Sequence, residues 1–148
     1  MNLRAFGCVA LLACLISNLV MIRQALADDM IGMEYFTAKR YDKAVDEFSK
    51  TLEVDENCAE AFVARGACYG LLNEYGKAMK DELRAIELLK NGKDKSLLSQ
   101  AYSNKASIEL KQDNYQLARK DARRALKLDA TNAAAQSILN DLAVKLRK

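Results

Sequence analysis

The sequence predicts an all-α fold, a solenoid of three helix-turn-helix repeats closed by a capping helix at its C-terminal end. Its 148 residues include no proline and only six glycines, so few residues interrupt a helix. Apolar residues recur at helical spacing along most of the chain. The stretch KRYDKAVDEFSKTLEVD at 39–55 also returns in altered form at 73–89 and 113–129, which is typical of stacked repeats.

The repeat register follows from an alignment on three alanines. Ala44 and Ala78 lie 34 positions apart, whereas Ala78 and Ala118 lie 40 apart, so a six-residue insert at 93–98 precedes the third unit. Three further columns keep this register, namely Tyr41, Tyr75 and Tyr115; Gly32, Gly66 and Ala106; and Thr51, Ala85 and Ala125. A period near 34 that holds several columns at once indicates one supersecondary unit repeated three times.

Each unit divides into two amphipathic halves joined by a short polar turn. In the second unit, Phe62, Gly66 and Tyr69 share one helical face, and the turn follows at Asn73. A second helix then resumes around Ala78. Small residues such as Gly66 and Ala78 allow two helices to cross closely, so we expect them at the contact between the halves.

This pattern resembles the tetratricopeptide repeat, whose motif combines small residues at fixed positions with aromatic residues between them. The three units run over 25–58, 59–92 and 99–132. Position 20 of the motif is alanine in every unit, whereas position 24 holds Phe48, then Glu82, then Ala122, and the closing proline is absent. The resemblance implies that residues 28–132 form a right-handed superhelix of three units.

Residues 1–27 have the layout of a secretory signal peptide. A basic start is followed by an uncharged, apolar run over 5–22, and Ala25 and Ala27 stand in the A-x-A arrangement that signal peptidase accepts. We expect cleavage after Ala27. The first alternative is an uncleaved anchor, because eighteen uncharged residues just suffice to span a membrane as a helix. A second, disfavoured alternative is a lipoprotein, since LLAC ending at Cys14 resembles a lipobox but the apolar run continues past it. Each of the three predicts that residues 28–148 work outside the cytoplasm, as a periplasmic, secreted or membrane-anchored domain.

Helix boundaries are indicated near the insert and at the C-terminal end. Asn91 and Gly92 favour a helix stop, and Asp94 can cap a new helix, so the third unit is expected to begin with a helix about a turn longer than usual. Residues 133–148 are predicted to form an amphipathic helix that caps the stack. The residues expected on its apolar face are Ile138, Leu139, Leu142 and Leu146.

Two cysteines, Cys58 and Cys68, lie beyond the N-terminal segment. An exported pair invites a disulfide. Ten residues along a helix correspond to about 15 Å of rise, however, and a disulfide tolerates a Cα separation of only about 7 Å. We therefore expect two free thiols that fill a helical core.

No motif for catalysis or cofactor binding is present. The chain lacks histidine, the usual general base and metal ligand, and it has no glycine-rich phosphate loop. The carboxylate pairs Asp55–Glu56 and Asp81–Glu82 are interpreted as solvent-exposed charge on helix faces. The prediction is a binding protein that is not an enzyme, with no catalytic, metal or cofactor site and no small-molecule substrate.

In the family that this pattern resembles, the first helix of each unit lines a concave groove. Carried over here, the resemblance implies a groove of Met30, Met33, Phe36, Val63, Ala64, Ala67, Leu71, Ser103, Asn104 and Ser107. Such a surface can accept an extended segment or an amphipathic helix of a partner protein. The expected function is therefore that of an exported or membrane-tethered interaction scaffold. The alternative is that the chain's own first or last helix fills the groove, or that these side chains simply pack against one another.

A subgroup of this family grips the acidic C-terminal tails of chaperones through a clamp that holds two carboxylates. The clamp needs lysine, arginine and asparagine side chains at five positions of the groove. Here those positions hold Asp29, Met33, Ala64, Gln100 and Asn104, and none of them fits the requirement. The resemblance therefore does not extend to that ligand.

Charge is unevenly distributed along the chain. Residues 28–92 carry nine basic and fourteen acidic side chains, a net charge of −5, whereas residues 93–148 carry twelve basic and six acidic ones, a net charge of +6. This dipolar arrangement favours head-to-tail contact between copies, so the sequence leaves a homo-oligomer open.

The basic residues of the second half include a cluster at helical spacing. Its members are Arg119, Lys120, Arg123, Arg124 and Lys127. The favoured interpretation is a solvated outer face. The alternative function is a basic surface that binds anionic membrane or nucleic acid. No aromatic residues are interleaved for base stacking, which disfavours nucleic acid.

Overall fold

The computed structural model describes the backbone of residues 3–147 and the side chains of residues 17–147 other than 22, 25 and 26. Over this part of the chain it contains seven α-helices and no strand, which confirms the all-α class. The helices are α1 (Leu3–Thr37), α2 (Tyr41–Val54), α3 (Ala59–Leu71), α4 (Tyr75–Leu89), α5 (Lys95–Lys111), α6 (Tyr115–Leu128) and α7 (Ala133–Lys145).

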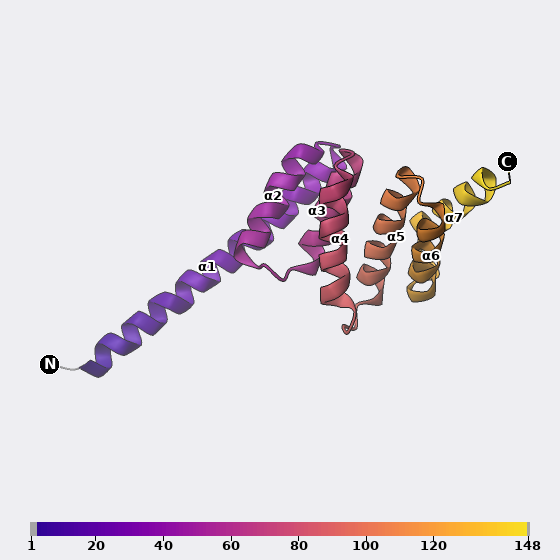
Figure 1. The fold of residues 1–148 in the computed structure, drawn as a ribbon. Coiled ribbons are helices and arrows are strands. Elements are labelled where there is room, and N and C mark those ends of the chain that lie inside the picture. The colour runs from indigo at the N-terminus through magenta and orange to yellow at the C-terminus, as the bar shows by residue number, and fades with distance from the viewer. Residues whose placement is uncertain (1–2, 148) are drawn as a thin grey trace.

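The helices stack in chain order, as Figure 1 shows, and they form two layers. Helices α1, α3, α5 and α7 contact one another in succession and make up one layer. Helices α2, α4 and α6 each pack between two helices of that layer and, among the described residues, do not contact one another. Three helix pairs and a terminal helix therefore follow one another along the stack, and the predicted solenoid is confirmed.

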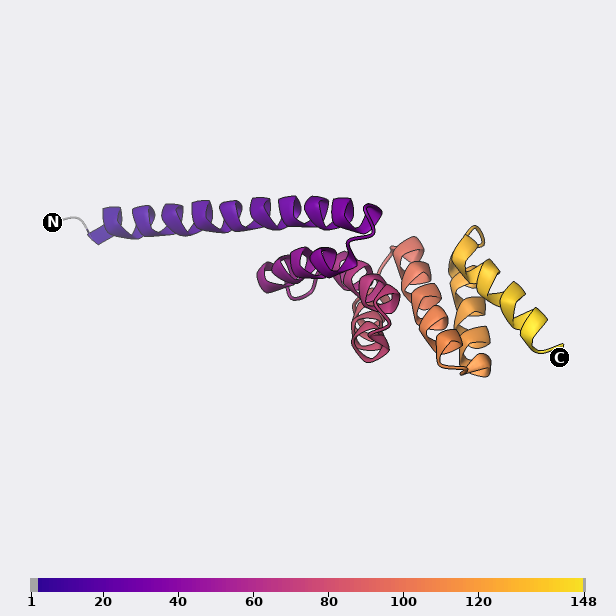
Figure 2. The same ribbon diagram turned by 90° about the horizontal axis from the view of Figure 1, so that it is seen from above.

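Helix α1 runs without a break through Ala27, the expected cleavage site. Its C-terminal part packs against α2 and α3, whereas its N-terminal part projects away from the stack as a straight helix (Figures 1 and 2). Among the described residues, no helix is long and apolar enough to cross a membrane. Most side chains of 5–22, on which the anchor hypothesis rests, lie outside the described residues, so cleavage and anchoring both stay predictions.

The predicted small-residue columns form the contact between the two layers. Ala44, Ala78 and Ala118 have no exposed surface, and the same holds for Ala85 and Ala125. With methyl groups alone at these points, the two helices of each unit approach closely. This part of the repeat prediction is confirmed.

Position 24 of the repeat holds side chains of different size. The residue at position 8, which is Gly32, Gly66 or Ala106, packs against it and is small where the side chain at position 24 is large. In the first unit, a Cβ atom added to Gly32 would lie 2.7 Å from the ring of Phe48. In the second unit, a Cβ atom added to Gly66 would lie 2.6 Å from Oε1 of Glu82. In the third unit both positions are alanine, and both alanines belong to one buried cluster. Glycine thus faces a large side chain and alanine faces a small one, which explains why the residue at position 24 varies from unit to unit.

The turn inside each unit uses a left-handed residue that the sequence did not reveal. Lys39, Asn73 and Asp113 have φ values of 58°, 61° and 60°. These residues occupy equivalent positions, directly after the first helix of each unit, where they close the helix. Asparagine and aspartate tolerate this conformation better than lysine does, so the turn of the first unit carries more backbone strain than the others.

The insert lengthens the first helix of the third unit, as predicted. Helix α5 has 17 residues and the equivalent α3 has 13, a difference of about one turn. Asp94 caps α5, because its Oδ1 accepts a hydrogen bond of 2.8 Å from the backbone N–H of Leu97. The preceding helix ends just before Asn91 and Gly92, also as expected.

Helix α7 covers the end of the core, and its apolar face is nearly the predicted one. Ile138 and Leu142 are buried and Leu139 is half-buried against the same cluster. The expectation for Leu146 is wrong, because the helix ends at Lys145 and the Leu146 side chain is 42% exposed.

Both cysteines beyond the N-terminal segment are free thiols, as predicted. Cys68 is fully buried beside Ala44 and Phe48, and burial raises the pKa of its thiol to about 12. Cys58 lies at the start of α3 and is only half-buried, so it is not the core filler that was expected.

Candidate functional site

A continuous groove runs along the layer formed by α1, α3, α5 and α7. It begins as a cavity of about 480 Å³ between α1 and α3. It continues as a cavity of about 510 Å³, which is lined by α1, α3, α5 and the start of α7. The two cavities share Met33, Glu60 and Ala64 and therefore open into each other. Both lie within the range of about 300–1,000 Å³ that is typical of ligand pockets.

All ten residues that the resemblance implied for the groove line it or a smaller side cavity that adjoins it. Leu71 and Ser107 belong to the side cavity, which joins the main groove at Phe36, Ala67 and Asn104. The exposed fractions are 69% for Met30, 50% for Met33 and 51% for Leu71, whereas Val63 is buried at the floor. The first two units thus present apolar side chains to solvent and the third presents polar ones.

The chain's own terminal helices are walls of this groove. Helix α1 contributes Met33 and Phe36 to one side, and α7 contributes Ala134 at the far end. Among the described residues, no helix lies across the groove, since the neighbouring layer packs on its other side. The hypothesis that the first or last helix fills the groove is therefore wrong for this conformation.

The groove is acidic as well as apolar. The charged side chains that line its two main cavities are Asp29, Glu34, Glu60 and Asp129. Among the described side chains, no lysine or arginine lines either of these two cavities, whereas Lys111 lines the adjoining side cavity. None of the four carboxylates forms a salt bridge with a described residue. The acidic first half of the sequence thus concentrates part of its charge at the entrance of the groove.

The environment of Asp29 reflects this concentration of negative charge. Partial burial raises the pKa of the Asp29 carboxyl, and the nearby charges of Glu60 and Asp28 raise it further. A hydrogen bond of 3.0 Å from Thr51 opposes these effects without cancelling them. A positive group in this part of the groove would relieve the repulsion.

A family profile described as tetratricopeptide repeat matches residues 29–58 and 99–132, which cover the first and third units of this stack. The chain belongs to the tetratricopeptide repeat (TPR) family. The second unit, α3 and α4, has the same helix-turn-helix form in the structure although the profile does not reach it.

Related proteins and domains support the same fold. Mouse Tetratricopeptide repeat protein 14 is 30% identical over 119 residues, which are 80% of this chain and 16% of that protein. The TPR2B domain of yeast Sti1, solved as a complex with pHsp70, has a TM-score of 0.69 at 25% identity and covers 83% of this chain and 95% of its own. The first TPR domain of Spaghetti (RPAP3), solved with the HSP90 peptide SRMEEVD, has a TM-score of 0.74 at 24% identity, with coverages of 86% and 96%. The chain therefore matches nearly the full length of these two solved TPR chains, but it spans only about a fifth of the length of the curated relatives it matches.

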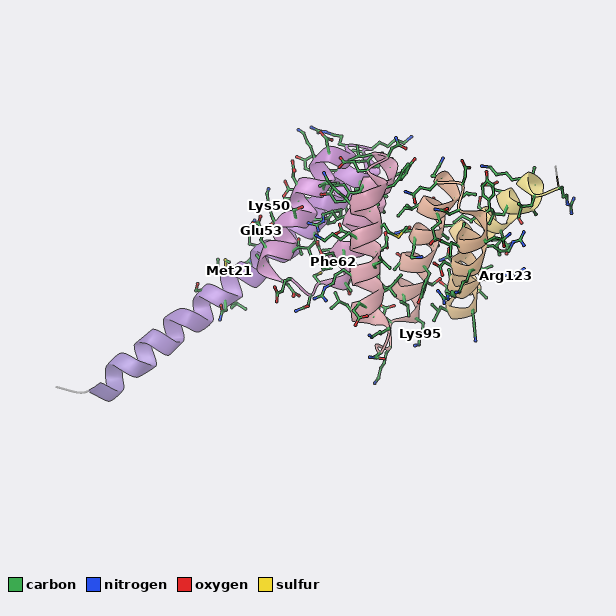
Figure 3. All side chains as sticks on the ribbon, in the orientation of Figure 1. Met21, Lys50, Glu53, Phe62, Lys95 and Arg123 are labelled. Carbon is green, nitrogen blue, oxygen red and sulfur yellow. The ribbon has the colours of Figure 1, made fainter. Side chains whose placement is uncertain are left out.

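The predicted basic cluster lies on α6, in the layer opposite the TPR groove. It surrounds a shallow depression formed by Arg119, Lys120, Arg123, Arg124 and Lys127 together with Gln116. Arg124 is paired, because its Nη1 lies 2.7 Å from Oδ1 of Asp121 and its guanidinium stacks over Tyr102. The other four form no salt bridge with a described residue, and Figure 3 shows Arg123 on the outer side of α6.

The interpretation of Asp81 and Glu82 as surface charge is wrong. Their exposed fractions are 4% and 0%, because both lie on the face of α4 that packs against α3 and α5. Asp81 accepts two hydrogen bonds from the Arg65 guanidinium, one of 2.7 Å from Nε and one of 2.9 Å from Nη2. Asp55 and Glu56 are exposed, as expected.

The Arg65–Asp81 pair has an equivalent 40 residues later, in the same register as the alanines. There Lys105 pairs with Asp121, which is also buried. A basic residue in the first helix and an acidic one in the second thus form a repeated column in units two and three. In both units the basic residue precedes its acidic partner by 16 positions. This repeated spacing of opposite charges is the sequence signal that could have identified both buried pairs.

Glu82 is buried without a cationic partner and lies directly behind the groove. Its Oε1 accepts a hydrogen bond of 3.0 Å from Nδ2 of the groove residue Asn104. Its Oε2 has no partner among the described residues. Burial raises the pKa of the Glu82 carboxyl well above its ordinary value, and the charge of Asp81 adds to this shift. The groove wall is therefore held by a carboxyl group that is stable in its protonated form.

Proposed function

We propose that this chain is a non-catalytic interaction scaffold whose TPR groove binds a segment of a partner protein. The observation that carries the proposal is the set of exposed apolar side chains inside the groove, above all Met30 and Met33 at 69% and 50% exposure. Contiguous exposed apolar surface in a concave site is typical of interaction sites. Domains of the same fold have been solved with peptides of HSP90 and HSP70, which supports peptide binding as the general activity.

The proposal is tested by replacing Met33→Asn together with Leu71→Asn. Both substitutions remove apolar contact from the groove without adding charge, so the outcome does not depend on the charge of the partner. Apolar anchors at the centre of an interface each contribute more than about 1 kcal/mol. We expect capture of the partner by the full-length chain from its own cells to fall at least about tenfold.

The matched control is Leu83→Asn with Leu117→Asn, two leucines of α4 and α6 that are 49% and 51% exposed outside the groove. This control is expected to keep capture at the wild-type level. Unchanged capture by the folded groove variant would contradict the proposal. Loss of capture only in a variant with Arg123→Gln and Lys127→Gln would support the alternative function, a basic face that binds anionic membrane or nucleic acid.

We further propose that the protein works outside the cytoplasm, exported or tethered by its N-terminal segment. The basic start, the apolar run over 5–22 and the A-x-A arrangement before Asp28 support this proposal. The N-terminal part of α1 projects away from the stack (Figure 1), and the residues that line the two main cavities of the groove begin at Asp29, so this arrangement is compatible with either alternative. N-terminal sequencing of the mature chain distinguishes cleavage after Ala27 from a retained anchor.

A further inference from the structure

We infer that the partner segment bound by the TPR groove is cationic and apolar, opposite in charge to the acidic peptide SRMEEVD that the structurally similar RPAP3 domain binds. This inference rests on the proposed function and adds the chemistry of the ligand to it. It follows from what lines the groove, where apolar side chains and unpaired carboxylates occur together.

The apolar part of the recognition lies between α1 and α3. Met30 and Met33 project from α1 and are at least half exposed, and the ring of Phe48 and the methyl group of Ala64 border the same cavity. Methionine adapts its shape to varied apolar groups, so such a surface accepts aliphatic or aromatic side chains of a peptide. This surface determines that the ligand carries apolar residues.

The charged part of the recognition surrounds that surface. Glu34 and Glu60 are exposed on α1 and α3, and the half-buried Asp29 lines the same cavity. Asp129 extends the acidic lining toward the end of the stack. Among the described side chains, no basic one lines these two cavities, so the charges that a ligand meets there are negative. Lys111 lines the adjoining side cavity, beyond the acidic part of the groove. Lysine or arginine residues in the ligand complement this lining, and an acidic peptide is repelled by it.

A metal ion is a poorer explanation of the same carboxylates. Among the described side chains, no three aspartate, glutamate or cysteine residues are close enough to hold one. The carboxylates are spread along the groove, as the charges of an extended or helical segment are. The five positions that would hold an acidic tail, among them Asp29 and Met33, also lack the basic side chains for it.

The experiment measures binding of two fluorescent peptides to the full-length chain by anisotropy. One is SRMEEVD and the other is SRMKKVK, both amidated, so that they share their apolar residues and differ in charge. We expect the cationic peptide to bind at least about tenfold more tightly at 50 mM salt, and the difference to shrink as salt screens the groove.

Charge reversal in the groove gives the decisive comparison. Glu34→Lys with Glu60→Lys is expected to abolish the preference for the cationic peptide. The matched control, Asp46→Lys with Glu53→Lys, makes the same change of net charge on the exposed side of α2, where Figure 3 shows Glu53, and it is expected to keep the preference. Circular dichroism and thermal unfolding verify that both variants are folded.

Several outcomes would overturn the inference. Equal or tighter binding of the acidic peptide, lost in Met33→Asn with Leu71→Asn, would refute the cationic ligand and leave groove binding standing. Binding of neither peptide would also refute the inference, and so would a preference for the cationic peptide that survives charge reversal in the groove. In either case the capture experiment with Met33→Asn and Leu71→Asn still decides whether the groove binds a partner. A wild-type dimer that dissociates in the Glu34→Lys, Glu60→Lys variant would mean that the groove binds a basic segment of a second copy, such as residues 144–148. That result would overturn the assignment to a partner protein.

Discussion

Replacing Asp81 by alanine is expected to lower the free energy of unfolding by about 3–5 kcal/mol, the range for breaking a buried ion pair. Asp81 is 4% exposed and accepts two hydrogen bonds from Arg65, whose Nη1 also donates to Ser49 at 3.0 Å. Arg65 thereby joins α3 to both α2 and α4. Without Asp81, its guanidinium loses its only acidic partner among the described residues while it stays largely buried. Urea unfolding followed by circular dichroism measures the effect.

Two further variants separate this explanation from a general sensitivity of the fold. Asp46→Ala removes an exposed carboxylate of α2 and is expected to change stability by less than about 0.5 kcal/mol. Arg65→Met combined with Asp81→Leu replaces the pair by apolar groups, so it should be clearly more stable than Asp81→Ala alone. If the double variant is as unstable as the sum of its single substitutions, the uncompensated charge is not the cause.

Replacing Glu82 by glutamine is expected to make the protein more stable than wild type at neutral and alkaline pH. Burial raises the pKa of Glu82 in the folded state, so the folded protein keeps a proton that the unfolded chain releases above about pH 4.5. The stability due to neutral Glu82 is thus fully present below that pH and is lost as the pH rises through the folded pKa. The loss amounts to about 1.4 kcal/mol per pH unit within this window.

The glutamine variant removes this loss because it stays neutral, and its amide oxygen can still accept the hydrogen bond from Asn104. We expect a gain of at least about 1 kcal/mol at pH 7 over wild type, and a difference that shrinks toward pH 4.5. Urea unfolding of both proteins from pH 4.5 to 8.5 measures the difference, with Glu53→Gln as the control for the loss of an exposed carboxylate. A difference that does not depend on pH would show that Glu82 is not the titrating group.

The parts of the fold that sequence reasoning predicted are those fixed by side-chain size and spacing. The alanine columns that begin at Ala44 and Ala85, the added turn of α5 and the cap at Asp94 all follow from rules that a single chain displays. The groove residues were located for the same reason, because a fixed repeat register places equivalent positions on one face.

Three features were not predicted from the sequence, each for its own physical reason. The first is the burial of two carboxylates on a helix whose two faces both carry charged residues. In α4, Asp81 and Glu82 lie among lysine and glutamate residues, and composition does not distinguish the buried carboxylates from the exposed ones. The left-handed conformation of Lys39 was missed because lysine gives no local signal for it. The acidic lining of the groove was missed because Glu60 and Asp129 come together only through the stacking of three units.

The uneven charge of the sequence corresponds to two differently charged regions of the structure. The acidic first half supplies carboxylates to the groove, and the basic second half supplies the exposed cluster on α6 in the opposite layer. The groove and the cluster on α6 therefore differ in sign. A ligand that is drawn to the groove by charge is repelled by the cluster on α6.

Position-specific photo-crosslinking of the full-length chain, in the cells that make it, shows whether the groove binds a segment of a partner protein. The photoreactive residue p-benzoylphenylalanine replaces Met33 in the groove or, as a control of matching exposure, Leu117 on α6. If the groove is the binding site, the chain with the probe at Met33 crosslinks to one defined partner and the chain with the probe at Leu117 does not. A partner crosslinked from Leu117 and not from Met33 would contradict groove binding.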